Sequence, residues 1–103
     1  MPTTLDRVPR IPSAAAALIG GHIAEHRRRQ GMTQDQLAVA SDIDSSNIRS
    51  YESGRALMNV FSLVRIAEAL GLAPGDLLEG VTSDMFATNR NDGRRTRPTA
   101  PRT

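Results

Sequence analysis

The stretch TQDQLAVASDIDSSNIRSYESG, residues 33–54, decides the fold, because it predicts two short helices joined by a tight turn. Thr33 is a favourable N-cap for the first of these helices, and Gln36, three residues later, completes a capping box. Ala38 is small, so another helix can cross this one closely. The inner side of the helix is expected to be narrow and to consist of Leu37, Ala38 and Ser41.

The turn between the two helices is expected at residues 42–44, with Ile43 buried within it. Asp44 is then the N-cap of the second helix, and Gly54 closes that helix. Ile48 and the residues three and four positions after it point inward at helical spacing. The side chains left on the outside are polar, and they are Ser45, Ser46, Asn47, Arg49 and Ser50.

A longer helix is expected before this pair, starting after the N-cap Ser13 and running to about Gln30. Gly31 fits the position after a helix end, where Gly adopts the left-handed conformation most easily. We interpret Gly20-Gly21 as a weak point within this helix, since Gly lowers helix stability. The inner stripe comprises Leu18 or Ile19, then Ile23, with Arg27 one turn further on.

Two more helices are expected after the pair. Asn59 is the N-cap of the first, and apolar residues at spacings of three and four mark residues 60–70 as amphipathic. Pro74, at a first helical position, favours a short fifth helix that carries Leu77 and Leu78. The apolar positions of the fourth helix are Phe61, Leu63, Val64, Ile66, Ala67 and Leu70.

The two ends of the chain differ in composition from its middle. Residues 1–12 hold three Pro without helical periodicity and are expected to form a flexible arm. Residues 81–103 carry five Arg and two acidic residues, a net charge of +3, whereas residues 1–80 carry eight Arg and nine acidic residues, a net charge of −1. We therefore expect an all-α protein, with a compact five-helix domain at residues 13–80 and a disordered, Arg-rich C-terminal tail from Ala87 on.

The composition argues against several kinds of site. No Cys is present, so neither a disulfide nor a thiolate metal site can form. The apolar run at residues 14–19 is too short for a secretory signal, and no stretch approaches the roughly 18 apolar residues of a membrane span. His22, Glu25 and His26 spell H-x-x-E-H, a zinc-peptidase pattern, but a domain this small lacks a second layer to form a substrate cleft. We interpret these three as solvent-facing residues and expect no metal, no cofactor and no catalysis.

Several residues in and around the stretch agree with one known family in both identity and spacing. These residues are Arg27, Gln34, Leu37, Ala38, Ile43, Ile48, Glu52 and Gly54. The runs IAEALGL at 66–72 and DLL at 76–78, which follow them, also agree with the family. Over about residues 18–80 the chain resembles the Cro and phage-repressor family of helix-turn-helix proteins, often called XRE. The resemblance implies a compact repressor-like domain whose second motif helix enters the major groove of double-stranded DNA.

The resemblance also implies a role for each polar residue of the motif. Arg27 and Glu52 match an ion pair that ties the first helix to the recognition helix. Arg49 is the one long donor on the reading face, and we expect it to read a guanine through O6 and N7, which is worth roughly 1–3 kcal/mol. The base-facing positions are Ser45, Ser46, Arg49 and Ser50, and the positions that contact phosphates or brace other side chains are Gln34, Asn47 and Arg55.

Three positions depart from the family pattern. Asp42 stands in the turn where Gly is usual, and a residue with a side chain adopts the left-handed conformation less easily. Asp44 stands where Ser or Thr often caps the recognition helix, and it adds a second acid near the DNA phosphates. Met58 replaces a Pro that is common before the fourth helix. These departures bear on the strength and register of DNA binding more than on the fold.

The function expected from the resemblance is that of a cytoplasmic transcription regulator, a repressor that binds its operator as a homodimer. The setting stays open among a phage repressor, a restriction-modification controller, an antitoxin with a toxin as partner, and a general regulator. The alternative is a protein-interaction module, antitoxin-like or adaptor, with weak or no DNA binding. The large apolar residues just after the fifth helix, together with one from that helix, are expected to form a dimer contact rather than a small separate core. They are Leu78, Val81, Met85 and Phe86.

Overall fold

The computed structural model describes residues 13–86, so the expectations for the arm at 1–12 and for the Arg-rich tail lie outside the described residues. This part of the chain is helical without strands, which confirms the expected all-α class. A 3₁₀ helix that was not predicted, η2 (Ser83–Phe86), follows the five expected helices. Those helices are α1 (Ala14–Arg29), α2 (Gln34–Ser41), α3 (Ser45–Glu52), α4 (Val60–Leu70) and α5 (Pro74–Leu77).

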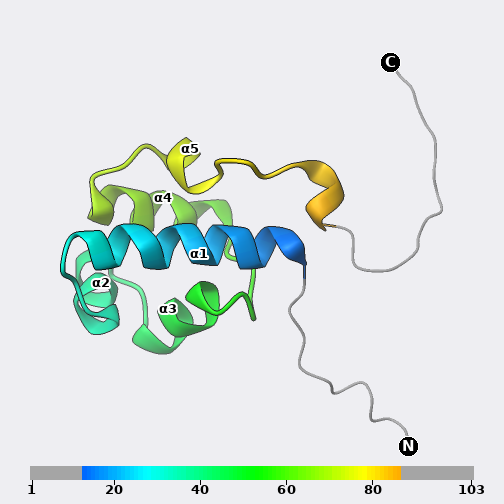
Figure 1. Ribbon diagram of the computed structural model, residues 1–103. Coiled ribbons are helices and arrows are strands. Elements are labelled where there is room, and N and C mark those ends of the chain that lie inside the picture. The colour runs from blue at the N-terminus through cyan, green and yellow to red at the C-terminus, as the bar shows by residue number, and fades with distance from the viewer. Residues whose placement is uncertain (1–12, 87–103) are drawn as a thin grey trace, which may run out of the picture.

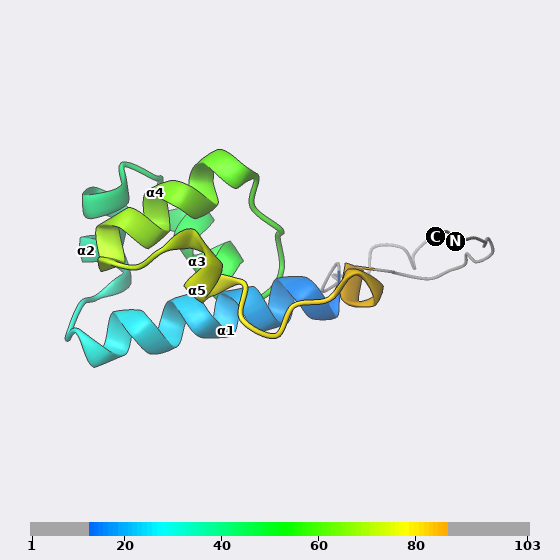
Figure 2. The same ribbon diagram turned by 90° about the horizontal axis from the view of Figure 1, so that it is seen from above.

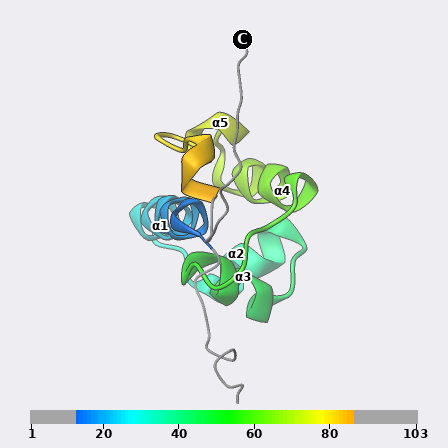
Figure 3. The same ribbon diagram turned by 90° about the vertical axis from the view of Figure 1, so that its right-hand side faces the viewer.

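The helices surround one core. In Figure 1, α1 runs across the middle of the molecule, with α2 and α3 on one side and α4 and α5 on the other. The view along α1 in Figure 3 shows the same helices as a ring. Figure 2 shows the segment after α5 running beside α1 toward η2, which contacts α1. No helix within residues 13–86 is both long and apolar enough to cross a membrane.

The starts of α1 and α2 agree with the capping residues expected from the sequence. The Oγ of Ser13 accepts a hydrogen bond from the amide of Ala16 at 3.1 Å. The Oγ1 of Thr33 accepts from the amide of Gln36 at 3.0 Å, and the Oε1 of Gln36 accepts from the amide of Thr33 at 2.8 Å. These contacts satisfy amide groups that have no partner inside the helix, which is why the chain begins each helix where it does.

Every α-helix contributes to the core, which follows the apolar spacing read from the sequence. The inner side of α2 consists of Leu37, Ala38 and Ser41, as expected. Leu77, from the short α5, is fully buried and joins the same cluster. The cluster consists of Ile19, Ile23, Leu37, Ala38, Ile48, Leu63, Ile66, Ala67, Leu70 and Leu77.

Three expectations about individual side chains are wrong. Ile43 is half-buried rather than buried, because the turn lies at the rim of the core. Phe61 is 67% exposed and lies over the guanidinium of Arg65 instead of entering the core, since it occupies the first turn of α4 at the edge of the helix bundle. Asp44 precedes α3 but makes no side-chain cap bond, and its carboxylate accepts from the hydroxyl of Ser46 at 3.2 Å.

The turn between α2 and α3 depends on an unusual backbone conformation. Asp42 has φ 57° and ψ 44°, in the left-handed helical region, and it is the one non-glycine residue with a positive φ among residues 13–86. A side chain in that conformation costs about 1–2 kcal/mol, although Asp is among the residues that tolerate it best. The rest of the structure must therefore hold the turn in place.

Gly20 is not the weak point that its place within α1 suggested. A methyl group at this position would lie 2.1 Å from the carbonyl oxygen of Tyr51 and 2.8 Å from that of Glu52. The missing side chain therefore allows the end of α3 to lie directly on α1. At the neighbouring Gly21 a methyl group would meet nothing within 4 Å.

Substituting the two adjacent glycines by alanine is expected to change stability in opposite directions. Gly20→Ala should lower the free energy of unfolding by roughly 3 kcal/mol, because the new methyl group forces α1 away from α3. Gly21→Ala should raise it by about 0.5–1 kcal/mol, since alanine favours an exposed helix position. Urea denaturation followed by circular dichroism measures both values, and a Gly20→Ala protein as stable as its parent would contradict the close contact.

Candidate nucleic-acid interface

α3 lies on the side of α1 opposite α5 (Figure 1), and its polar side chains are exposed or half-buried. Ile48 is fully buried and anchors the helix to the core. Of the residues expected to face DNA bases, Ser46 and Arg49 are exposed, whereas Ser45 and Ser50 are half-buried. Asn47 and Arg55, expected near phosphates, are exposed at the start of α3 and just after its end.

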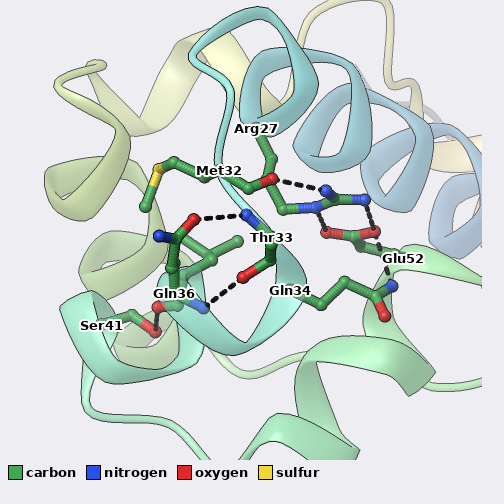
Figure 4. A network of polar contacts seen from close by, with 8 residues as sticks. Arg27, Met32, Thr33, Gln34, Gln36, Ser41 and Glu52 are labelled. Atoms are coloured by element: carbon green, nitrogen blue, oxygen red, sulfur yellow. Dashed lines mark hydrogen bonds and ion pairs between the residues drawn. The ribbon is translucent and has the colours of Figure 1, made fainter.

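A network of polar contacts fixes the end of α3 to α1 and to the start of α2 (Figure 4). Arg27 donates from Nε to Oε2 of Glu52 at 2.6 Å and from Nη2 to Oε1 at 2.9 Å. Its Nη1 donates to the carbonyl oxygen of Met32 at 2.8 Å. Gln34 donates from Nε2 to Oε1 of Glu52 at 2.9 Å, so three helices meet at one carboxylate.

The Arg27–Glu52 pair is largely removed from water, with side chains 11% and 5% exposed. The hydrogen bond to Glu52 raises the pKa of Arg27 above its ordinary value, while desolvation by burial works in the opposite direction. Removing one partner of such a pair leaves a buried charge without compensation and costs about 3–5 kcal/mol. This pair therefore supports the structure, and Gln34 braces it.

Arg49 lies on the surface with a different kind of partner. Its Nη2 donates to Oδ1 of Asp35 at 3.2 Å, and its Nη1 donates to Oγ of Ser45 at 3.4 Å. The side chains of Arg49 and Asp35 are 54% and 72% exposed, and exposed pairs contribute only about 0–1 kcal/mol. The sequence did not indicate Asp35, because its partner lies on the next helix, 14 positions later in the chain.

Acidic groups surround this surface. Residues 13–86 carry six Arg and nine Asp or Glu, and Asp35, Asp42 and Asp44 are all exposed around the turn between α2 and α3. Four of the six Arg are paired with carboxylates, and they are Arg27, Arg29, Arg49 and Arg65. The positive charge near α3 is therefore local rather than spread over the domain.

The residues expected at a dimer contact do not share one environment. Leu78 and Phe86 are exposed, whereas Val81 and Met85 are half-buried and Val81 packs against the core. Leu78 and Phe86 line an apolar hollow of about 160 Å³ between α1, α4 and η2. Two further exposed apolar side chains, Leu57 and Val60, line the same hollow and were not identified from the sequence.

Two of the three H-x-x-E-H residues of α1, His22 and Glu25, have partners within the protein. The Nε2 of His22 lies 2.8 Å from the carbonyl oxygen of Glu79, and Glu25 accepts from Arg29 at 2.7 Å. Within residues 13–86 no group of three or more His, Cys, Asp or Glu is placed to hold a metal ion. His22 thus contacts the loop that follows α5.

Comparisons with known proteins agree with this geometry. A family model described as a helix-turn-helix domain matches residues 18–80. The protein y4dJ of Sinorhizobium fredii, described as an uncharacterized HTH-type transcriptional regulator, is 31% identical over 71 residues, which cover 69% of this chain and 92% of the relative.

Solved structures with the same fold include two kinds of regulator. The restriction-modification controller protein C.AhdI from Aeromonas hydrophila superposes with a TM-score of 0.59 at 27% identity, over 60% of this chain and 94% of its own. The clp gene regulator ClgR from Corynebacterium glutamicum superposes with a TM-score of 0.61 at 25% identity, over 65% and 71% of the two chains. The chain therefore belongs to the helix-turn-helix family of the Cro and phage-repressor (XRE) type, a family of DNA-binding transcriptional regulators.

Proposed function

We propose that this protein is a sequence-specific repressor that inserts α3 into the major groove of an operator and acts as a homodimer in the cytoplasm. The observation that carries the proposal is the polar outer face of α3, held at the surface by the contacts of Glu52 with Arg27 and Gln34. A major groove about 12 Å wide admits one α-helix, and base edges are reached from the exposed side of that helix.

Arg49 carries most of the base recognition in this proposal. Its guanidinium presents two donors that match O6 and N7 of guanine, whereas serine hydroxyls are short and bond to several bases. Arg49 is 54% exposed, so its side chain is free to leave the protein surface. The serines that accompany it at base-facing positions are Ser45, Ser46 and Ser50.

Binding requires Arg49 to exchange its partner. The pair with Asp35, at 3.2 Å, is exposed and therefore weak, so a guanine that offers both O6 and N7 can replace it. A base without this acceptor pair leaves Arg49 better paired with Asp35. We infer that Asp35 contributes to discrimination by competing for Arg49.

Phosphate contacts set the position of α3 on the DNA. Asn47 and Arg55 are exposed beside α3, and we assign them to phosphates. Gln34 braces Glu52, and its place at the start of α2 also puts its backbone amide at a helix N-terminus, which favours anions. With nine acids against six Arg in residues 13–86, few phosphates can be neutralised, so the salt dependence of binding should be shallow for a protein of this kind.

A homodimer would bring two copies of α3 to half-sites about 34–36 Å apart, one helical turn of DNA. The surface that supports it is an apolar patch, defined here by Leu57, Val60, Leu78 and Phe86, which line one hollow and are exposed. Such side chains exposed together are unfavourable in water, and a symmetric contact would cover the same patch on both copies. Val81 and Met85 would lie at its margin.

Replacing Arg49 by alanine should reduce discrimination more than general affinity. We expect about 5- to 150-fold weaker binding to an operator selected from random DNA, corresponding to roughly 1–3 kcal/mol, with little change on unrelated DNA. Arg28→Ala, which removes the same charge from the exposed end of α1, should leave the ratio of the two affinities unchanged. Equal sequence preference in Arg49→Ala and the parent protein would disprove the assignment of Arg49.

Charging the apolar patch should separate the dimer. A Leu78→Asp, Phe86→Asp double variant places two carboxylates on each side of the contact, so sedimentation equilibrium should report a monomer at concentrations where the parent is a dimer. Val39→Asp, on an 82% exposed residue of α2 outside the patch, is the matched control and should remain dimeric. A double variant with the parent's mass would show that the dimer forms elsewhere.

A further inference from the structure

Arg65, from the middle of α4, reaches across to the turn between α2 and α3. Its Nε donates to the carbonyl oxygen of Ser41 at 3.0 Å, and its Nη2 donates to the carbonyl oxygen of Asp42 at 2.8 Å. The same Nη2 lies 2.7 Å from Oδ2 of Asp42. One guanidinium thus binds the last carbonyls of α2 together with the carboxylate of the turn residue.

Those carbonyls are the groups that lack partners at the end of a helix. Asp42 follows α2 in the left-handed conformation, which leaves its amide donating to Val39 at 3.2 Å and the amide of Ile43 donating to Ala38 at 3.0 Å. A glycine would adopt this conformation without strain, but Asp42 carries a Cβ atom. The two contacts from Arg65 to Asp42 depend on the position of its carbonyl and carboxylate, so they favour the observed conformation of Asp42.

The guanidinium is itself held in place. Its central carbon lies 4.8 Å from the centre of the Phe61 ring, a cation–π distance, and Phe61 is one turn before Arg65 on α4. The Arg65 side chain is 27% exposed, compared with 54% for Arg49. Phe61 and the backbone acceptors therefore fix both sides of Arg65, which explains why an otherwise exposed aromatic ring occupies this position.

We propose that Arg65 is a positioning residue for DNA recognition: it locks the turn at Asp42 and so sets the angle at which α3 leaves α2. The Arg65–Asp42 ion pair also places a positive charge against an acid at the edge of the DNA-facing surface. This inference rests on the proposed function, but the locking of the turn is a property of the free protein. Arg65 acts through α3 and needs no contact with DNA.

A positioning role and a phosphate contact give different results in binding experiments. If Arg65 only positions α3, Arg65→Gln should weaken binding to the selected operator about tenfold, as expected from the loss of roughly 1.4 kcal/mol of turn stabilisation, and leave binding to unrelated DNA and the salt slope unchanged. A phosphate contact would weaken binding to all sequences and reduce the salt slope by about 1, which would overturn the proposal.

Two double variants test the turn itself. Combined with Arg65→Gln, Asp42→Gly should restore operator binding to within about twofold of the Asp42→Gly single variant. Glycine adopts this conformation without stabilising contacts from Arg65. Asp42→Ala removes the same charge but keeps a Cβ atom, so the Asp42→Ala, Arg65→Gln protein should stay impaired. Equal operator binding by the two double variants would contradict the proposal.

Amide hydrogen exchange separates this proposal from the proposed function. The amide of Ile43, which bonds to Ala38 only while the turn is formed, should exchange about tenfold faster in Arg65→Gln, and Asp42→Gly should restore its protection. This result is expected whether or not the protein recognises an operator. Unchanged exchange at Ile43 in Arg65→Gln would rule out the stabilisation of the turn by Arg65. A parent protein that binds DNA without sequence preference would rule out the proposed function alone.

Discussion

The close contact between α1 and the end of α3 is the constraint on which the rest of the structure depends. Gly20 allows the carbonyl ends of α3 to approach the backbone of α1, and one turn beyond Ile23 the Arg27–Glu52 pair closes the same seam. The first contact is steric and the second is electrostatic, and each requires the other, because a buried ion pair forms only if the helices are close enough to exclude water. With α3 anchored along one side, its opposite side is left for recognition.

The parts of this fold that are local in sequence could be predicted from it. Thr33 and Gln36 cap α2 from positions three residues apart, and helical spacing places Leu37, Ala38 and Ile48 in the core. The contacts that were missed join residues far apart in the chain. Gly20 could not be distinguished from Gly21 by sequence, because the difference lies in carbonyl groups some thirty positions later. The Arg65 contacts and the Asp35–Arg49 pair were missed for the same reason, and Phe61 was assigned to the core because spacing alone does not show where a helix leaves it.

The arginines near α3 differ in how firmly they are held, and this difference matches the structural and recognition roles proposed for them. Arg27 is buried with three acceptor atoms, and Arg65 is partly buried between backbone carbonyls and an aromatic ring. Arg49 is exposed and holds its partner at the longest distance of the three. An arginine that must bind a base cannot be tightly bound beforehand, because the contacts it leaves reduce the affinity it gains.

The acidic surface around the turn then has a physical role in discrimination. Every DNA sequence presents the same phosphates, so positive charge strengthens binding to all sites alike, whereas an acid without a base-reading partner, such as Asp44, weakens binding to all sites alike. Because uniform contributions cancel in the ratio of two affinities, selectivity under the proposed function comes from the few contacts to bases and from the competition of Asp35 for Arg49. With one long donor on the reading face and a turn residue held in a strained conformation by Arg65, small changes in the angle of α3 alter those few contacts directly. Under the proposed function, specificity therefore depends on the accuracy of the helix position more than on the number of contacts.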